Sequence, residues 1–455
     1  MVDFIREQEV VSLLENSNKT DKVEIREIIQ KSRLCKGLSL EEVAKLLYIE
    51  DKELLAEMFE AAKFVKNKVY GKRVVLFAPL YTSNECTNNC LYCGFRRDNK
   101  ELHRRTLTLA EIINEAKAIE AQGHKRILLI CGEDPRTTNV KHLTQAMEAV
   151  YKAGDIRRIN IEAAPMKVEE YKELKNAGIG TYVIFQETYN RDVYQKMHPT
   201  GLKADYDWRI TAIDRAFEAG IDDVGVGALF GLYDYRFEVL GLLMHAQSFE
   251  KRYGVGPHTI SVPRLRPALG WGLKEIPNEV NDDEFRKIVA IFRLAVPYTG
   301  IILSTRERAD FRDELLSLGV SQISAGSKTN PGGYKEDDDK ADQFEVSDHR
   351  SLSKMLETIC DQGYIPSFCT ACYRRCRTGE AFMEYAKEGE IHEFCQPNAI
   401  LTFKENLMDY GTESLKNKGE KMISKALLEI EDAKMRILTK EKLKEIEEGK
   451  RDIYF

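Results

Sequence analysis

The chain has 455 residues, of which 43% are hydrophobic and 31% are charged, and its formal net charge is -6. Lys and Glu are interleaved without a basic block, which excludes the charge pattern expected for nucleic-acid or anionic-membrane partners. No apolar run reaches the roughly 20 residues of a membrane span. Residues 1–22 lack the apolar core of a signal peptide, so we expect a cytoplasmic protein.

Residues 1–70 are predicted to form a helical N-terminal extension. Apolar positions recur at helical spacing among charged residues in SLEEVAKLLYIEDKELLAEMFEAAKFVKNKVYG, and the glycine at the end of this stretch is a helix stop signal. No strand pattern precedes residue 71.

From residue 73 onward, short β-branched runs alternate with amphipathic stretches such as TLAEIINEAKAIEAQG. Eight β-then-α units over about 250 residues match an α/β fold of the (β/α)8, TIM-barrel type, which we predict for residues 71–330. A doubly wound open sheet is the competing interpretation. The eight strand runs are VVLFAPL, RILLICGE, RINIEAAP, GTYVIFQE, DDVGVGAL, HTISVPRL, IILSTRE and QISAGS.

Residues 331–455 are predicted to form a helical C-terminal domain. The run KTNPGGYKEDDDKADQFEVS at 328–347 is Gly-rich and then acidic, and it predicts an exposed connection. Helical stretches follow, residues 369–395 carry several cysteines, and the last part of the chain has the pattern of two packed helices.

Cysteines are the most informative residues of the chain. There are ten, and without a secretion signal this number indicates metal or redox sites in preference to a disulfide framework. One group is formed by Cys86, Cys90 and Cys93, and a second by Cys369, Cys372 and Cys376, with Cys395 downstream.

The first group, CTNNCLYC, follows the first predicted strand, where a barrel places its reactive loops. Thiols at i, i+4 and i+7 can bind three corners of a 4Fe-4S cube and leave the fourth iron open. An incomplete zinc site or part of a disulfide scaffold are the alternatives, although zinc sites favour pairs of cysteines with two-residue spacing.

The spacing C-x3-C-x2-C, followed by glycine and an aromatic residue, resembles the radical S-adenosylmethionine (SAM) superfamily. The resemblance implies that SAM binds the open iron of the cube, and that Glu133 in CGED receives the SAM amino group through a charge-assisted hydrogen bond. It also implies that Glu187 in FQETY and Arg209 hold the ribose and carboxylate of SAM. Without the family, a Gly-Glu pair at a strand end is equally typical of a helix-entry loop.

The second group, C-x2-C-x22-C at Cys369, Cys372 and Cys395, resembles the auxiliary-cluster motif of the HydG family, tyrosine lyases that mature FeFe-hydrogenase. The likeness continues through LYDYRFEVLGLLMHA, VGPHTISVPRLRPAL and GKRDIYF and covers most of residues 60–455. It implies a second 4Fe-4S cluster whose open iron faces a labile iron bound by His258. On spacing alone, a structural zinc site remains the alternative.

One departure from the family concerns Cys376, which stands with Arg375 in a segment where glycine is usual. Cys376 is either an idle thiol or a competing ligand, and in the second case it puts the assignment of Cys395 in doubt. The run SKTNPGGY is similar to the tyrosine lyase of thiamine synthesis, which lacks the second cluster.

The resemblance implies a radical SAM lyase that cleaves the Cα–Cβ bond of L-tyrosine to p-cresol and dehydroglycine. CO and cyanide would then form on iron for maturation of the hydrogenase active site. The implied partners are L-tyrosine, SAM, an electron donor such as ferredoxin or flavodoxin, and other hydrogenase maturation proteins. The alternatives are a simple aromatic amino acid lyase of the thiamine type and a non-catalytic iron-sulfur scaffold or carrier.

A tyrosine carboxylate is well matched by a bidentate arginine. Arg306 in LSTRE, at the end of the seventh predicted strand, is the candidate, with Ser304 assisting. A structural salt bridge is the alternative role for Arg306.

Overall fold

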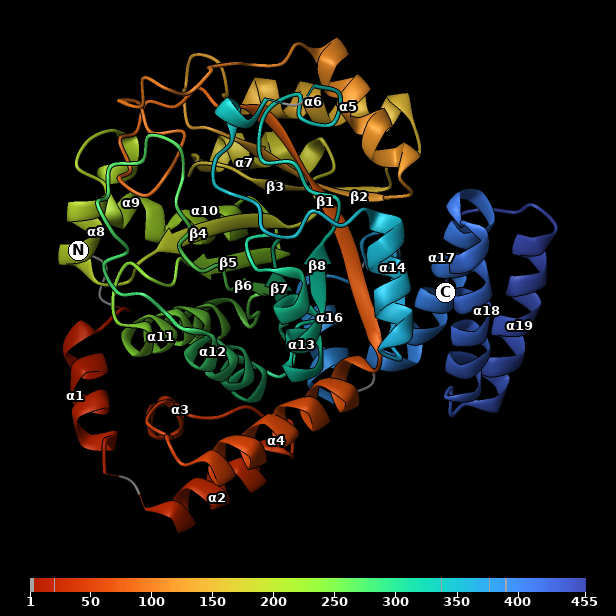
Figure 1. Ribbon diagram of the computed structural model, residues 1–455, viewed down its shortest axis with the longest axis horizontal. Helices are drawn as coiled ribbons and strands as arrows, with labels where there is room; N and C mark the ends of the chain where they lie inside the picture. The colour runs from red at the N-terminus through yellow and green to blue at the C-terminus, as the bar shows by residue number, and fades with distance from the viewer. Residues whose placement is uncertain (1–3, 20, 337, 376, 389–390) are drawn as a thin grey trace.

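The computed structural model describes residues 4–19, 21–336, 338–375, 377–388 and 391–455, and shows a closed parallel barrel surrounded by helices (Figure 1). β1 pairs with both β2 and β8, which closes the sheet. The predicted (β/α)8 class is therefore confirmed against the open sheet. The barrel strands are β1 (Arg73–Ser83), β2 (Arg126–Cys131), β3 (Arg158–Glu162), β4 (Tyr182–Glu187), β5 (Val224–Ala228), β6 (Thr259–Ser261), β7 (Gly300–Leu303) and β8 (Gln322–Ser324).

Apolar strands and amphipathic helices produce this architecture. Every residue of β1 and β5 is buried, as expected for strands covered on the outside by helices. Small residues shape the interior: a Cβ on Gly227 of β5 would lie 2.5 Å from the Phe185 ring, so glycine there leaves room for this aromatic side chain. The outer helices are α5 (Leu109–Ala121), α6 (Val140–Ala153), α7 (Val168–Asn176), α8 (Arg191–Met197), α9 (Tyr206–Ile210), α10 (Ala212–Glu218), α11 (Tyr235–Tyr253), α12 (Asp282–Ala295), α13 (Ala309–Leu318) and α14 (Leu352–Asp361).

The N-terminal region is helical, as predicted. Its last helix, α4 (Lys52–Tyr70), is followed by Gly71, whose φ of 61° is a conformation that glycine adopts without strain. α4 packs against α12 and α13, so this region covers one side of the barrel (Figure 1). The helices are α1 (Glu7–Ser17), α2 (Lys22–Ser32), α3 (Leu40–Leu47) and α4 (Lys52–Tyr70).

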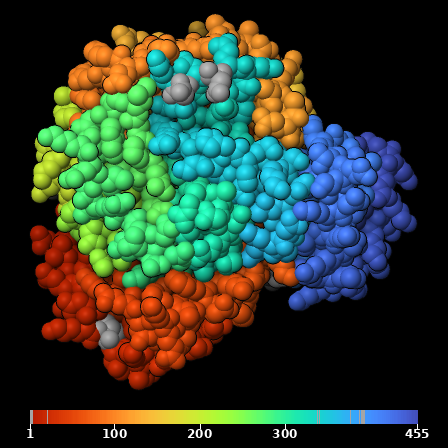
Figure 2. Space-filling view, in the orientation of Figure 1, coloured from red at the N-terminus to blue at the C-terminus, as the bar shows by residue number. Residues whose placement is uncertain are grey.

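The C-terminal region is mostly helical, and α17–α19 form a lobe beside the barrel (Figure 2). It also contains a strand that the sequence pattern did not predict. β9 (Ile365–Ser367) pairs with the first residues of β1, from Arg73 to Val75. A three-residue strand that contains Pro366 has no recognisable pattern of its own and depends on its neighbour. The helices are α15 (Ala371–Arg374), α16 (Gly379–Glu388), α17 (Ile391–Tyr410), α18 (Glu413–Leu428) and α19 (Ala433–Glu447).

The prediction that residues 328–347 form an exposed connection is wrong for much of the segment. Thr329, Asn330 and Phe344 are buried, whereas Glu336 and Lys340 are exposed. The segment packs over the C-terminal ends of the strands: the Tyr334 hydroxyl donates to the Pro79 carbonyl at 2.8 Å. Its composition indicates a loop, but the composition does not reveal that this loop covers a cavity. Among the described helices, none is long and apolar enough to cross a membrane.

Candidate active site

The loop that follows β1 carries Cys86, Cys90 and Cys93. Backbone hydrogen bonds fix it on several sides: Thr87 donates to the Glu133 carbonyl at 2.8 Å and Leu91 to the Met197 carbonyl at 3.0 Å. The three thiols line one cavity of about 650 Å³. The loop is therefore held by the β2 end and by α8, and it presents its cysteines to a common space.

The cavity contains the three residues that the sequence suggested for SAM. Glu133, Glu187 and Arg209 all line it together with the cysteines. Glu133 Oε2 accepts a hydrogen bond from Asn88 at 2.6 Å, and Glu187 Oε1 accepts one from Lys203 Nζ at 2.6 Å. An ammonium group and hydroxyl groups are the ligand chemistry that such carboxylates accept.

Two backbone features aim these side chains into the cavity. The β4–β5 register shifts between Phe185 and Glu187, and Glu187 has a φ of 72°, which is rare for a residue other than glycine. At the end of β2, a Cβ on Gly132 would collide with the Glu85 carbonyl oxygen, so only glycine permits this close approach of the cysteine loop. Strained backbone of this kind is typical of functional sites.

Their surroundings hold the three thiols in the protonated form. Burial raises the pKa of Cys90 to about 12 and that of Cys93 to about 11, and the neighbouring thiols add to the shift of each. The thiols therefore carry protons until iron displaces them. Among the described residues, no three His, Cys, Asp or Glu side chains converge on a single ion. In a cube each cysteine binds a different iron, so its thiols stand further apart than those around one ion.

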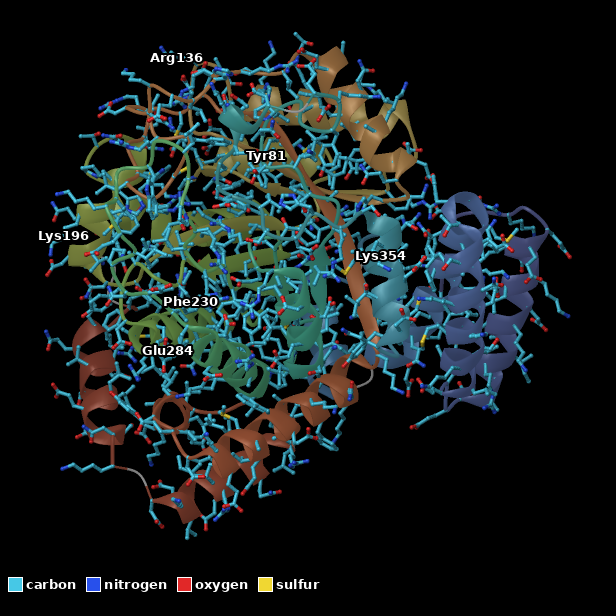
Figure 3. All side chains as sticks on the ribbon, viewed as in Figure 1. Tyr81, Arg136, Lys196, Phe230, Glu284 and Lys354 are labelled. Atoms are coloured by element: carbon cyan, nitrogen blue, oxygen red, sulfur yellow. The ribbon has the colours of Figure 1, made fainter. Side chains whose placement is uncertain are left out.

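A second cavity, of about 840 Å³, occupies the barrel interior beside the first. Its walls are largely apolar and include Phe77, Leu128 and Phe185. Tyr81, labelled in Figure 3, lies near the C-terminal end of β1, and its hydroxyl donates to Gln343 Oε1 at 2.8 Å. We call this cavity the chamber.

Arg306 and Ser304 both line the chamber. The Arg306 guanidinium lies 3.5 Å from the centre of the Phe344 ring, and no acidic side chain in the described ranges pairs with it. Its Nε is buried without a hydrogen-bond partner, and burial lowers its pKa. The salt bridge considered as an alternative is therefore not found, and the cation is available to an anionic ligand.

The second cysteine group lies at the other end of the barrel. Cys369, Cys372, Cys395 and His258 line a pocket of about 490 Å³ beneath the first residues of the strands. The pKa of Cys395 is lowered because its sulfur accepts a hydrogen bond from Cys372 and lies near Arg73. Cys376 lies outside the described residues.

His258 has a buried acidic neighbour. Its Nδ1 lies 3.0 Å from a carboxylate oxygen of Asp223, although the pair is not aligned as a hydrogen bond. The imidazole stacks on Phe382 with the ring centres 4.2 Å apart. Gln322 lines both this pocket and the chamber, so it lies between the two ends of the barrel.

Several residues of these cavities were not suggested by the sequence. Glu162 stands at the end of β3 and resembles Glu187 in its strand-end position, a signal that could have been used. No local pattern indicates the others, since long-range folding brings them to the cavities. We call the chamber and the cavity of Cys86, Cys90 and Cys93 the upper cavities, and the pocket of Cys369, Cys372 and Cys395 the lower pocket. The residues are Tyr81, Lys203, Gln343 and Phe344 near the upper cavities and Arg73, Asp223, Tyr373 and Phe382 near the lower pocket.

Comparisons with known proteins agree with this geometry. Residues 80–241 match the Radical SAM superfamily, and residues 261–365 match the Biotin and Thiamin Synthesis associated domain. The chain is 34% identical to the 2-iminoacetate synthase of Salmonella typhimurium strain LT2, over 72% of this chain and 86% of that protein.

Two solved structures resemble the whole chain. A crystal structure of HydG, a maturase of FeFe-hydrogenase, has a TM-score of 0.97 and 52% identity, with all of both chains covered. The FeFe-hydrogenase maturase HydG from Carboxydothermus hydrogenoformans has a TM-score of 0.86 and 44% identity, over 97% of this chain and 98% of that chain.

A closed (β/α)8 barrel with three free thiols after its first strand, matched to the superfamily over residues 80–241, defines a radical SAM enzyme. A 4Fe-4S cluster and SAM are its cofactors. Within that class, the chain belongs to the HydG family of FeFe-hydrogenase maturases.

Proposed function

We propose that the protein is a radical SAM lyase that cleaves the Cα–Cβ bond of L-tyrosine to p-cresol and dehydroglycine. The observation that carries this proposal is Arg306, a cation that no acidic side chain of the described ranges pairs with. It lies in the apolar chamber, next to the cavity of the three cysteines, which we call the SAM cavity. An aromatic amino acid offers both a carboxylate for this arginine and a ring for the apolar walls.

The chain's own residues position and protect the substrate. Arg306 binds the tyrosine carboxylate through two N–H groups, and Ser304 adds a hydroxyl. The aromatic and aliphatic walls hold the ring and exclude water, which protects radicals from side reactions. When bound, the cluster and SAM supply a 5'-deoxyadenosyl radical, which removes hydrogen from the substrate.

We further propose that Cys369, Cys372 and Cys395 hold a second 4Fe-4S cluster, with His258 as a ligand of an additional, labile iron. Arg73 contributes to the lowered pKa of Cys395, after the hydrogen bond from Cys372, whereas the pKa values of Cys369 and Cys372 are raised. A cation beside the three sulfurs would stabilise them as thiolates, the form that binds iron. Dehydroglycine, which is 2-iminoacetate, would cross the barrel past Gln322 and yield CO and cyanide there. Residues 331–455 would then be an auxiliary-cluster domain, attached to a catalytic barrel at 71–330 and a helical extension at 1–70.

The proposal includes a reductant and a recipient. Reductive cleavage of SAM consumes an electron, for which a ferredoxin or flavodoxin is suitable, and iron carrying CO and cyanide would pass to other hydrogenase maturation proteins. Arg97, Lys100 and Lys196 are exposed on or near the cysteine loop and could contact an acidic carrier, although Arg97 already pairs with Asp98.

The test is a product assay under anaerobic conditions with reconstituted protein, SAM, L-tyrosine and dithionite. We expect 5'-deoxyadenosine, p-cresol and CO, and none of them from a Cys93→Ala variant. A simple lyase of the thiamine type would release p-cresol without CO. An iron-sulfur carrier would give neither 5'-deoxyadenosine nor p-cresol, and that result would refute the lyase proposal.

A further inference from the structure

Glu162 has a position that neither the cysteine motifs nor the SAM residues explain. It is the last residue of β3, and its neighbours in register are Ile130 of β2 and Val183 of β4. Its side chain lines both the chamber and the cavity that contains the three cysteines. Glu162 therefore stands where a substrate in the chamber would meet SAM.

The Glu162 carboxylate lacks a partner within the described ranges of the chain. No side-chain hydrogen bond or ion pair from another described residue reaches this half-buried carboxylate, which lines the space shared by the two cavities. Three cations attract Glu162 electrostatically, Arg306 most and then Lys203 and Arg209, but none of them forms an ion pair with it. Lys203 Nζ donates to Glu187, and Arg209 Nε donates to the Phe185 carbonyl at 2.6 Å. A donor supplied by a ligand would satisfy the carboxylate.

Among the described residues that line the chamber, Arg306 is thus a cation and Glu162 a carboxylate without an ion-pair partner. Arg306 follows β7 and Glu162 ends β3, so in an eight-stranded barrel they lie on opposite walls. An α-amino acid is a zwitterion whose opposite charges sit on neighbouring atoms of one carbon. With its carboxylate on Arg306, its amino group is the donor available to Glu162.

We propose that Glu162 binds the α-amino group of the amino acid substrate and holds its nitrogen at the junction between the chamber and the SAM cavity. This inference rests on the proposed lyase function and assigns it a further substrate-binding residue. It predicts that a ligand needs a free amino group to bind tightly, because a ligand without one would leave the carboxylate unsatisfied.

The electrostatic surroundings agree with a cationic ligand. Burial, followed by repulsion from Glu187, raises the pKa of Glu162 to about 7, and a bound ammonium would lower this pKa again. Protonation below about pH 7 removes the negative charge that attracts the ligand. The charged and titratable groups facing Glu162 are Glu187, Arg306, Lys203, Arg209, Tyr81 and Cys131.

The experiment compares two ligands on two proteins. Reconstituted protein with an oxidised cluster does not cleave SAM, so calorimetry can measure the binding of L-tyrosine and of 3-(4-hydroxyphenyl)propanoate, which lacks the amino group. We expect Glu162→Gln to weaken L-tyrosine binding about 10- to 100-fold and to leave the analogue unaffected. The L-tyrosine affinity of the wild type should fall below about pH 7, and that of the variant should not.

Controls distinguish the alternatives. Glu169→Gln changes an exposed carboxylate on the following helix α7 and should alter neither affinity. If Glu162→Gln weakens SAM binding and not L-tyrosine binding, the carboxylate accepts the SAM ribose and the inference is wrong. Equal losses for L-tyrosine and the analogue would also overturn it. Failure of the wild type to bind L-tyrosine at all would refute the lyase proposal as well, whereas L-tyrosine binding retained by the variant refutes only the role of Glu162.

Discussion

At the scale of single residues, Arg306 differs from the arginines around it. Arg264 forms ion pairs with Glu307 and Asp282, and Arg308 is exposed and paired with Asp282. Among the described residues, no carboxylate pairs with Arg306, whose guanidinium lies 3.5 Å from the centre of the Phe344 ring. The residue is half-buried and its Nε is buried without a hydrogen-bond partner, a costly arrangement unless a ligand completes it, so its neighbourhood indicates substrate binding.

Replacing Arg306 by alanine should lower kcat/KM for L-tyrosine about 30- to 700-fold, because a charge-assisted bidentate contact is lost. This corresponds to a loss of roughly 2 to 4 kcal/mol of transition-state stabilisation. Arg306→Lys should recover only part of this loss, since an ammonium cannot form the bidentate fork. The measurement is p-cresol formation against tyrosine concentration, with iron content and SAM cleavage measured in parallel.

Arg308→Ala is the matched control, because it removes an exposed arginine two residues away. Its p-cresol kinetics should equal those of the wild type. Unchanged kinetics in Arg306→Ala would instead assign that residue to structure.

The sequence predicted which residues belong to the site only where a motif or a strand end marks them. The cysteines and Glu133 stand in short patterns, and the strand-end rule of barrels locates Arg306. Gln343 belongs to a loop of unremarkable composition, and it reaches Tyr81 only because that loop folds back over the barrel. Such contacts depend on tertiary structure, so no local pattern indicates them.

At the scale of elements, α11 supports the turn that follows β4. Glu238 of α11 is fully buried, and its carboxylate accepts hydrogen bonds from the Thr188 hydroxyl and from the Tyr189 backbone N–H. Glu187, the residue before this turn, has the left-handed φ of 72° and faces the SAM cavity. The Glu238 contacts therefore stabilise a strained backbone at the active site.

The pH dependence of stability should report Glu238. Burial raises its folded pKa from 4.5 to about 8, so between these values the folded state keeps a proton that the unfolded chain has released. The free energy of unfolding should therefore fall as pH rises from about 4.5 to about 8, by at most about 5 kcal/mol from this group. Glu238→Gln cannot ionise and should show a shallower fall in urea titrations.

Other groups titrate in the same range, so the informative quantity is the difference in the free energy of unfolding between the wild type and Glu238→Gln at each pH. Glu380→Gln, which changes another glutamate, in the first turn of α16, should leave the wild-type pH profile unaltered. Parallel profiles for the wild type and Glu238→Gln would mean that Glu238 ionises as easily in the folded protein as in the unfolded chain.

Elements with a strong periodic pattern were predicted well, whereas those defined by a neighbour were not. All eight barrel strands overlap the predicted runs, although β1 and β7 extend beyond theirs, because each is an apolar run in a β-then-α unit. β9 has three residues and exists through its pairing with β1. The segment 328–347 was predicted to be exposed from its acidic composition, but Thr329, Asn330, Ala341 and Phe344 within it are buried.

At the scale of the whole molecule, the two thiol groups occupy opposite ends of one barrel. Cys86, Cys90 and Cys93 follow the C-terminal end of β1, whereas Cys369 follows β9, which pairs with the first residues of β1. Arg126, the first residue of β2, donates to the Cys369 carbonyl at 2.7 Å. The lower pocket is thus attached to the barrel itself as well as to the helices of the C-terminal region.

This separation predicts that the two proposed reactions can be uncoupled. Changing Cys369 and Cys372 to serine removes ligands from the lower pocket and leaves the upper cavities intact. We expect p-cresol formation to stay within about threefold of the wild type, a change of less than 1 kcal/mol. CO release should fall sharply. The measurements are p-cresol by chromatography, CO by trapping with a haem protein, and iron content.

His258→Ala provides a finer test of the same division. It leaves all three lower cysteines in place, so a second cluster should still assemble, while the additional iron loses a ligand and binds about 10- to 100-fold more weakly. His349→Ala, which changes a histidine outside both cavities, is the matched control. We expect normal p-cresol from both variants but little iron-bound CO, seen by infrared spectroscopy, from His258→Ala alone. Iron-bound CO at the wild-type rate from the cysteine-pair variant would show that the lower pocket is not where CO forms, and a structural zinc site would then be the better interpretation of Cys369, Cys372 and Cys395.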